Sequence, residues 1–310
     1  MKNKLLIAIS LLIVIIVISA TVLIIFSSNK TDEEESVIKD PFLWEIKGKN
    51  PSYLFGSIHL TGDDLLNLPS ALEEVIDEVD YIFTEVELND ETAMITLQAT
   101  MLPSGQKVQD LLPDDIEEKL DNYLVSKSLS LSFFSSFKIW SIMSTISILD
   151  QLDELVSSPG LDQYIWDLGI EKGKKMRGLE TAEEQLDIFD DLSIDEQIIL
   201  LNETIDLLIE YDKQGISSSE IMIEAYIDGD LEFLNDMLIT DFDPNDPLDV
   251  KIWDQLIANR NQYMVERIVD NITKNPDNQF LFIIGAGHFI GEDGILELLE
   301  DEGYLTERIK

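Results

Sequence analysis

Two short stretches near opposite ends of this 310-residue chain share one pattern of glycine, histidine and acidic residues. Residues 56–64 read GSIHLTGDD and residues 285–293 read GAGHFIGED, with the chain's two histidines, His59 and His288, at the same place in each. Matching both glycine positions by chance has a probability of about 0.0025, so the repeat is a strong signal. Each stretch follows an apolar run typical of a buried strand. If the two strands lie near each other in one sheet, the two histidines meet.

The rest of the pattern predicts an α/β (α+β) domain. Strand-like runs occupy both ends, and the pattern from about 90 to 272 is mostly helical, so we expect a central sheet built from both ends of the domain with a long helical insertion. Glu85 and Glu87 should point to the same face of their strand. The expected strands are 42–47, 53–58, 81–88, 280–284 and an edge strand from Tyr304, and the expected flanking helices are 69–79 and 294–302.

The histidines and acids suit a hydrolytic site. Ligand sites in open α/β sheets form beyond the carboxyl ends of strands, and a glycine there lets the backbone turn and approach a ligand closely. His59, His288 and a carboxylate from Glu85 or Glu87 would make a divalent-metal site with open positions. A metal-free site, with one histidine as general base and a glutamate orienting it, remains an alternative. So does a purely structural role for these side chains.

The charge balance excludes one class of partner. The chain has 62 acidic and 21 basic side chains, a formal charge of −41, whereas a nucleic-acid-binding protein needs a basic surface. The acidic balance fits a surface that attracts cations, or adaptation to salt. Cysteine is absent, which excludes disulfides, thiolate metal sites and a cysteine nucleophile.

The first thirty residues indicate a membrane address. Residues 5–26 carry no charge and, at 1.5 Å per residue, span about 33 Å, enough to cross a bilayer core. Lys2 and Lys4 precede them, so the positive-inside rule places the large domain outside the membrane. We expect a single-pass anchor over 1–30 and an acidic tether over 31–40, with a cleaved signal peptide as the alternative. The apolar segment 129–149 is expected to be a packed helix and not a second span.

Several motifs together resemble the TraB/GumN family, which includes PrgY-like pheromone-shutdown proteins and Tiki metalloproteases. The resemblance spans about 42–309, nearly all of the expected domain at 41–310. Its motifs are FGSIHL at 55–60, TEVEL at 84–88, Gly160-Leu161-Asp162, GLETAEEQLDIFDDLS at 178–193, Arg260-Asn261 and IGAGHFIGEDGILELLEDEGY at 284–304.

The resemblance implies a fold similar to erythromycin-esterase-like and ChaN-like domains. It implies that His59 and His288 are metal ligands or catalytic groups, with Glu85 preferred over Glu87 as the site carboxylate. Glu180 and Arg260 match polar positions of the same pocket. From the residues alone, Glu180 could instead be an acid favoured at a helix start. Arg260 could clamp a carboxylate or stabilise an oxyanion, or simply pair with a surface acid.

These observations lead to three hypotheses. The first is a membrane-anchored hydrolase, dependent on a divalent metal such as zinc, manganese or cobalt, that acts on peptides or proteins outside the membrane. Its partners would be that substrate and, through residues 5–26, the membrane. The second is a non-catalytic module that binds or sequesters a peptide signal, as the PrgY branch implies. The third is a domain whose acidic surface collects cations without the histidines.

Overall fold

One mixed sheet organises the part of the chain that the computed structural model describes, residues 38–60, 62–149, 159–239 and 242–310. Its strand order is β4-β3-β5-β2-β1-β6. The first four strands in that order run parallel, whereas β1 is antiparallel to both β2 and β6. The strands are β1 (Leu43–Ile46), β2 (Ser52–Ser57), β3 (Tyr81–Thr84), β4 (Lys175–Gly178), β5 (Phe280–Gly285) and β6 (Thr306–Ile309).

The two apolar strands that carry the repeated stretches are neighbours at the centre of the sheet. β2 and β5 pair in parallel, with Ser57 opposite Gly285 at their carboxyl ends. Every residue of both strands is buried, as expected for parallel strands covered on both faces. The prediction of a central sheet built from both ends of the domain is therefore confirmed, and β6 is the expected edge strand.

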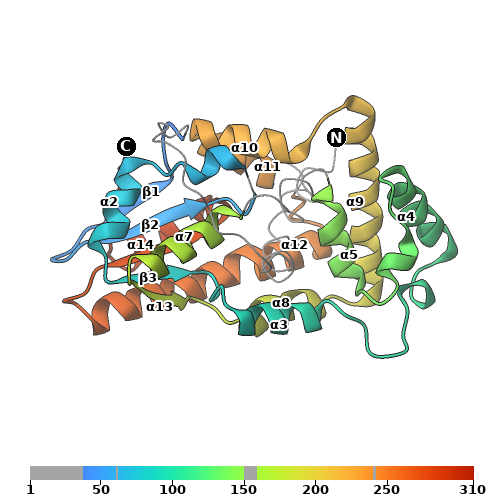
Figure 1. Ribbon diagram of the computed structural model, residues 1–310, viewed down its shortest axis with the longest axis horizontal. Coiled ribbons are helices and arrows are strands. Elements are labelled where there is room, and N and C mark those ends of the chain that lie inside the picture. Colours follow the sequence, from blue (N-terminus) through green and yellow to red (C-terminus); the bar gives the residue numbers. More distant parts are fainter. Residues whose placement is uncertain (1–37, 61, 150–158, 240–241) are drawn as a thin grey trace.

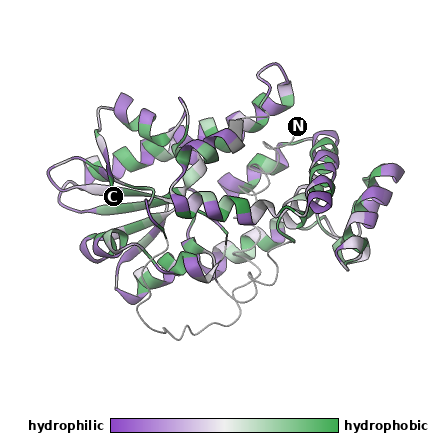
Figure 2. Ribbon diagram, turned by 90° about the horizontal axis from the view of Figure 1, so that it is seen from above, coloured by the Kyte–Doolittle hydropathy of each residue, from purple (hydrophilic) through white to green (hydrophobic). Residues whose placement is uncertain are grey.

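Helices surround this sheet and extend beyond it. Helices α2, α7, α13 and α14 lie beside the sheet, whereas α4, α5 and α9 form a separate group away from it (Figure 1). Hydrophobic colour dominates the strands and alternates with hydrophilic colour along the helices, as expected for helices with one buried face (Figure 2). The α-helices of the described residues are α2 (Ser70–Glu78), α3 (Asp90–Ala99), α4 (Asp114–Ser126), α5 (Ile139–Ile146), α7 (Leu161–Glu171), α8 (Ala182–Asp190), α9 (Ile194–Gln214), α10 (Ser218–Asp228), α11 (Leu231–Ile239), α12 (Pro247–Trp253), α13 (Asn259–Lys274) and α14 (Ile295–Asp301).

The insertion is mostly helical, as predicted, and it also contains β4, which pairs with β3. Two expectations about local structure are wrong. The strand expected over 81–88 ends at Thr84, where the chain bends. The segment 129–149 is not one helix, because a 3₁₀ turn at Leu131–Phe134 precedes α5. In each case tertiary pairing and turns override a pattern read along a single stretch.

The described residues contain no helix that is both long and apolar enough to cross a membrane. The expected anchor at 5–26 and most of the tether lie outside the described residues.

The N-terminus of helix α9 combines a capping box with an ion pair. Ser193 and Glu196 form a reciprocal capping box at the N-terminus of α9, and Lys251 from α12 donates to both Glu196 carboxylate oxygens, at 3.0 and 2.8 Å. These contacts, Lys251 first, lower the pKa of Glu196 from 4.5 to about 2. The ionised carboxylate therefore links α9 to α12.

We expect Glu196→Gln to lower the free energy of unfolding at neutral pH. The folded-state pKa lies below the ordinary value, so the stabilisation is full above about pH 4.5 and is lost as the pH falls towards 2. Glutamine keeps the capping-box geometry, so the difference from wild type should shrink over that range in urea unfolding. Asp195→Asn in the same helical turn is the control. A difference independent of pH would contradict this origin.

Candidate functional site

The polar cluster lies where the parallel strands end. His59 follows β2, Glu85 follows β3, Glu180 follows β4 and His288 follows β5. Arg260 reaches the same place from α13 and is 6% exposed. The carboxyl ends of neighbouring parallel strands form the usual ligand-binding edge of an α/β sheet. The structure thus brings together all five side chains that the sequence singled out.

The two repeated stretches occupy equivalent places but differ in local conformation. His288 lies in the 3₁₀ turn η6 (Ala286–Phe289), whereas His59 lies in irregular backbone before the 3₁₀ turn η1 (Asp63–Leu66). Gly291 has a positive φ of 80°, whereas Gly62 is extended. Both stretches lead on to a helix, α2 and α14, as predicted, but through different intervening turns. Neighbouring strands give them a shared position, and their different packing gives each its own turn.

Gly285 lets the two histidine stretches approach each other. A Cβ atom built there would lie 3.0 Å from His59 Nε2 and 3.2 Å from Glu85 Oε1. The Gly285 N–H also donates to Glu85 Oε1 at 2.8 Å. The first glycine of the second stretch is thus required for close approach to the site and not for an unusual φ.

His288 is held as a neutral ring with a defined tautomer. The Asn261 amide nitrogen donates to the carbonyls of His288 and Asp293, at 3.1 and 2.7 Å. Its oxygen must therefore accept from His288 Nδ1, 2.6 Å away. Burial first, and then the Arg260 charge, lower the pKa of His288 to about 3. Nε2 consequently carries a lone pair, which accepts from Arg260 Nη1 at 3.2 Å.

His59 has a carboxylate at the same ring position. Its Nδ1 lies 2.8 Å from Asp162 Oδ2, and Asp162 Oδ1 accepts from the Ser57 hydroxyl at 2.6 Å. Burial opposes the charged ring, but Asp162 and then Glu85 outweigh it and raise the pKa of His59 to about 9. Within the described residues, its buried Nε2 has no hydrogen-bond partner. The two histidines therefore differ in charge at neutral pH.

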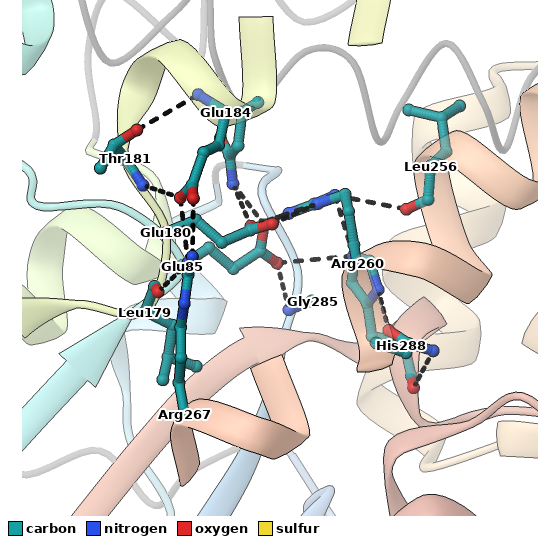
Figure 3. Close-up of polar contacts among 12 residues, drawn as sticks. Glu85, Leu179, Glu180, Thr181, Glu184, Leu256, Arg260, Arg267, Gly285 and His288 are labelled. Atoms are coloured by element: carbon teal, nitrogen blue, oxygen red, sulfur yellow. Dashed lines mark hydrogen bonds and ion pairs between the residues drawn. The ribbon is translucent and has the colours of Figure 1, made fainter. Parts of the chain in front are cut away.

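Glu85, Glu180 and Arg260 form a buried ion-pair network (Figure 3). Arg260 Nη2 lies 2.6 Å from both Glu85 Oε2 and Glu180 Oε2. Burial alone would raise the pKa of Glu85, but Arg260, with help from both histidines, holds it well below its usual range. Gln185 from α8 donates to both carboxylates, at 3.1 and 2.9 Å. Glu85 is thus fixed in place as an anion, and Glu180 is held beside it.

A π-helical turn positions the two site residues of α13. The turn η5 (Asp254–Ala258) joins α12 to α13 directly, and π turns inside α-helices often occur at functional sites. Arg260 and Asn261, immediately after it, are both buried. One ion-pairs with the carboxylates and the other holds His288. A consecutive pair of polar residues therefore serves two parts of the cluster.

The structure separates the two glutamates that the sequence left as alternatives. Glu85 is 3% exposed and lies in the cluster, whereas Glu87 accepts from Asn89 outside it. Sequence reasoning did not name Asp162, Gln185 or Asn261 as site residues. The only sequence feature that pointed to these three residues is that each lies within one of the motifs that resemble the family.

The two histidine Nε2 atoms and the Glu85 carboxylate are of the types that bind divalent metals, but they are not arranged at the distances of a formed metal site. His59 Nε2 and His288 Nε2 lie 3.7 and 3.9 Å from Glu85 Oε1. Imidazole nitrogens and a carboxylate suit zinc and similar ions, and the unpartnered His59 Nε2 faces the same oxygen. In the described ranges, however, no group of three or more His, Asp or Glu side chains is arranged to hold a metal ion.

Metalloproteases of the TIKI group are similar in sequence to most of the chain. Metalloprotease TIKI2 of Danio rerio is 25% identical over 316 residues, covering 86% of this chain and 60% of the relative. Metalloprotease TIKI1 of Homo sapiens is 26% identical over 317 residues, covering 86% of this chain and 61% of the relative. The chain thus spans less than two thirds of their length.

A bacterial relative is matched along most of its own length. The uncharacterized protein YbaP of Shigella flexneri is 22% identical over 255 residues, covering 82% of this chain and 89% of the relative. No solved structure matches the chain at a significant level. Because a family model matches residues 42–308, which include the whole cluster, this protein belongs to the TraB/PrgY/gumN family.

Proposed function

We propose that this protein is a divalent-metal-dependent hydrolase of peptides or proteins. The observation that carries the proposal is the convergence of two imidazole Nε2 atoms on one oxygen of Glu85, with His59 Nε2 buried and lacking a hydrogen-bond partner in the described residues. Similarity to the TIKI metalloproteases supports the choice of peptide or protein as substrate.

His59, His288 and Glu85 would hold the ion. Both histidines use Nδ1 for a neighbouring side chain and direct Nε2 at Glu85. A bound ion would take the place of the proton on His59 Nε2 and of the Arg260 hydrogen bond to His288 Nε2. A bound divalent ion supplies Lewis-acid chemistry, which polarises a carbonyl group and makes water a better nucleophile. Arg260 is the only cation in contact with both carboxylates in the described cluster, and it would keep Glu85 ionised and both carboxylates in position.

The proposal is tested by metal content and peptide cleavage. We expect the full-length chain to bind about one zinc, manganese or cobalt ion and to cleave peptides from a mixed library. His59→Ala and His288→Ala should each lose both properties, because each removes one of the two nitrogen ligands. Elemental mass spectrometry after dialysis and mass-spectrometric detection of products measure the two effects.

The alternatives give different results in the same samples. A sequestering module would bind a peptide without forming product and would retain that affinity in at least one histidine variant. An acidic surface that collects cations would bind many ions weakly and would be insensitive to both substitutions. Metal binding that is equal in wild type and variants would refute the hydrolase proposal.

We further propose that the chain is anchored in the membrane through residues 5–26, with the family domain outside the cytoplasm. The support is the uncharged segment preceded by Lys2 and Lys4. In alkaline extraction the protein should stay with the membrane, and protease added to spheroplasts should digest the domain. Release by alkali, or protection from the protease, would contradict this topology.

A further inference from the structure

The two histidines of the repeated pattern have chemically different partners. His288 Nδ1 contacts an amide oxygen, that of Asn261, whereas His59 Nδ1 contacts a carboxylate oxygen, that of Asp162. A lone pair on His59 Nδ1 would repel that carboxylate at 2.8 Å, so Nδ1 must carry the proton. The ring's other nitrogen, Nε2, is then the one that faces Glu85.

Asp162 is itself held in a fixed position. It lies in the first turn of α7, is 9% exposed, and accepts the Ser57 hydroxyl at 2.6 Å through the carboxylate oxygen that His59 does not contact. Ser57 is the last residue of β2, two positions before His59. The strand that carries the histidine therefore also fixes the residue that orients it.

No comparable restraint acts on the rest of the His59 ring. Within the described residues, Nε2 has no hydrogen-bond partner, and Glu85 Oε1 is 3.7 Å away. The ion-pair contact of Nδ1 with Asp162 Oδ2, at 2.8 Å, is therefore the shortest polar contact of the ring to a side chain. His288, by contrast, is restrained at both nitrogens, by Asn261 and by Arg260.

We propose that Asp162 is the positioning residue of His59: it holds Nδ1 protonated and directs Nε2 at Glu85. In relation to metal binding this inference rests on the proposed function, because a partner at the remote ring nitrogen fixes the tautomer of a ligating histidine. Loss of such a partner costs about 10- to 100-fold in metal affinity. Asn261 performs the same task for His288.

The chain's two histidines make a direct spectroscopic test possible. In the full-length chain labelled with ring-¹⁵N histidine, each ring gives one set of signals, assigned with His288→Gln. In Asp162→Ala we expect the low-field Nδ1 proton of His59 to be lost, while that of His288 stays unchanged. In Asp162→Asn it should persist at a shifted position, because an amide oxygen can accept from Nδ1, as Asn261 does. Zinc affinity should fall about 10- to 100-fold in Asp162→Ala and less in Asp162→Asn.

Asp167→Ala is the matched control, because this exposed aspartate lies on the same helix and its side chain accepts from Gln163 Nε2 at 3.0 Å, away from the cluster. It should leave both rings and the zinc affinity unchanged. A His59 spectrum in Asp162→Ala identical to that of wild type would overturn the inference. If that variant does not fold, an unshifted His59 signal in Asp162→Asn would overturn it as well. If wild type binds no zinc, the proposed function fails, but the ring signals still decide whether Asp162 positions His59.

Discussion

Arg260→Ala is expected to lower the free energy of unfolding by about 3–5 kcal/mol at neutral pH, because it leaves buried carboxylates without their cation. Arg260 pairs with Glu85 and Glu180, which are 3% and 8% exposed. Burial of the guanidinium opposes its charge, but the two carboxylates outweigh this and raise the pKa of Arg260. Urea unfolding followed by circular dichroism measures the effect.

A second arginine on the same helix provides the control. Arg267 pairs with Glu184 and is 37% exposed, so solvent screens the pair and Arg267→Ala should cost about 1 kcal/mol or less. Equal losses in the two variants would contradict the importance of burial. Arg260→Lys should recover part of the stability, since it restores the charge but not the fork of donors.

The loss in Arg260→Ala should also depend on pH. In wild type the pKa of Glu85 is held well below 4.5, so the stabilisation is full above that value and is lost as the pH falls. In the variant, burial without the cation raises the Glu85 pKa, so the carboxyl becomes neutral more easily and the strain of an unpaired charge is relieved. The difference in unfolding free energy between variant and wild type should therefore begin to narrow above pH 4.5, as the pH falls through the raised Glu85 pKa of the variant, and should narrow further as the pH falls towards the wild-type pKa. If the difference in unfolding free energy were the same at every pH, the destabilisation of Arg260→Ala would come from lost packing and not from the lost charge.

Glu85→Gln is expected to lower zinc affinity by more than about 100-fold and to abolish peptide cleavage. Even residues outside the ligand shell contribute about 10- to 100-fold to affinity, and Glu85 Oε1 is the atom that both histidines face. Glutamine keeps an oxygen that can accept from the Gly285 N–H but loses the negative charge. Isothermal titration with zinc and a product assay measure the two effects.

Glu87→Gln is the matched control, because it makes the same chemical change two residues away and outside the cluster. Glu87 pairs with Asn89, so its substitution should leave zinc affinity and cleavage within about twofold of wild type. If Glu87→Gln were the more damaging change, the assignment of Glu85 as the site carboxylate would be wrong. If neither variant changed zinc binding, the metal would lie elsewhere.

The sheet shows where local pattern was sufficient and where it was not. β2 and β5 are continuous apolar runs, and their burial at the centre of the sheet follows from that composition. β4 reads KMRG and is only partly buried, so no alternation or apolar run marked it as a strand. It forms because β3 offers it a parallel partner, which is a property of the fold and not of four residues.

The choice between Glu85 and Glu87 was likewise made by tertiary structure. Strand periodicity placed both on one face, but the strand ends at Thr84 and the chain bends, so Glu85 turns inward. The bend is held by pairing with the segment after β4, where Glu180 N donates to Glu85 O. A pattern of period two cannot report where a strand stops.

The sequence by itself identified the two repeated glycine–histidine stretches, and the family resemblance pointed to Glu85, Glu180 and Arg260 as further members of the cluster. Only the tertiary structure decided their chemical states. Helices α7, α8 and α13 bring Asp162, Gln185 and Asn261 to the ends of the strands, and these contacts fix the tautomers and hold the carboxylates. The physical reason is that a side chain's protonation depends on charges and donors within a few ångströms of it. Here those neighbours lie tens to hundreds of residues away along the chain.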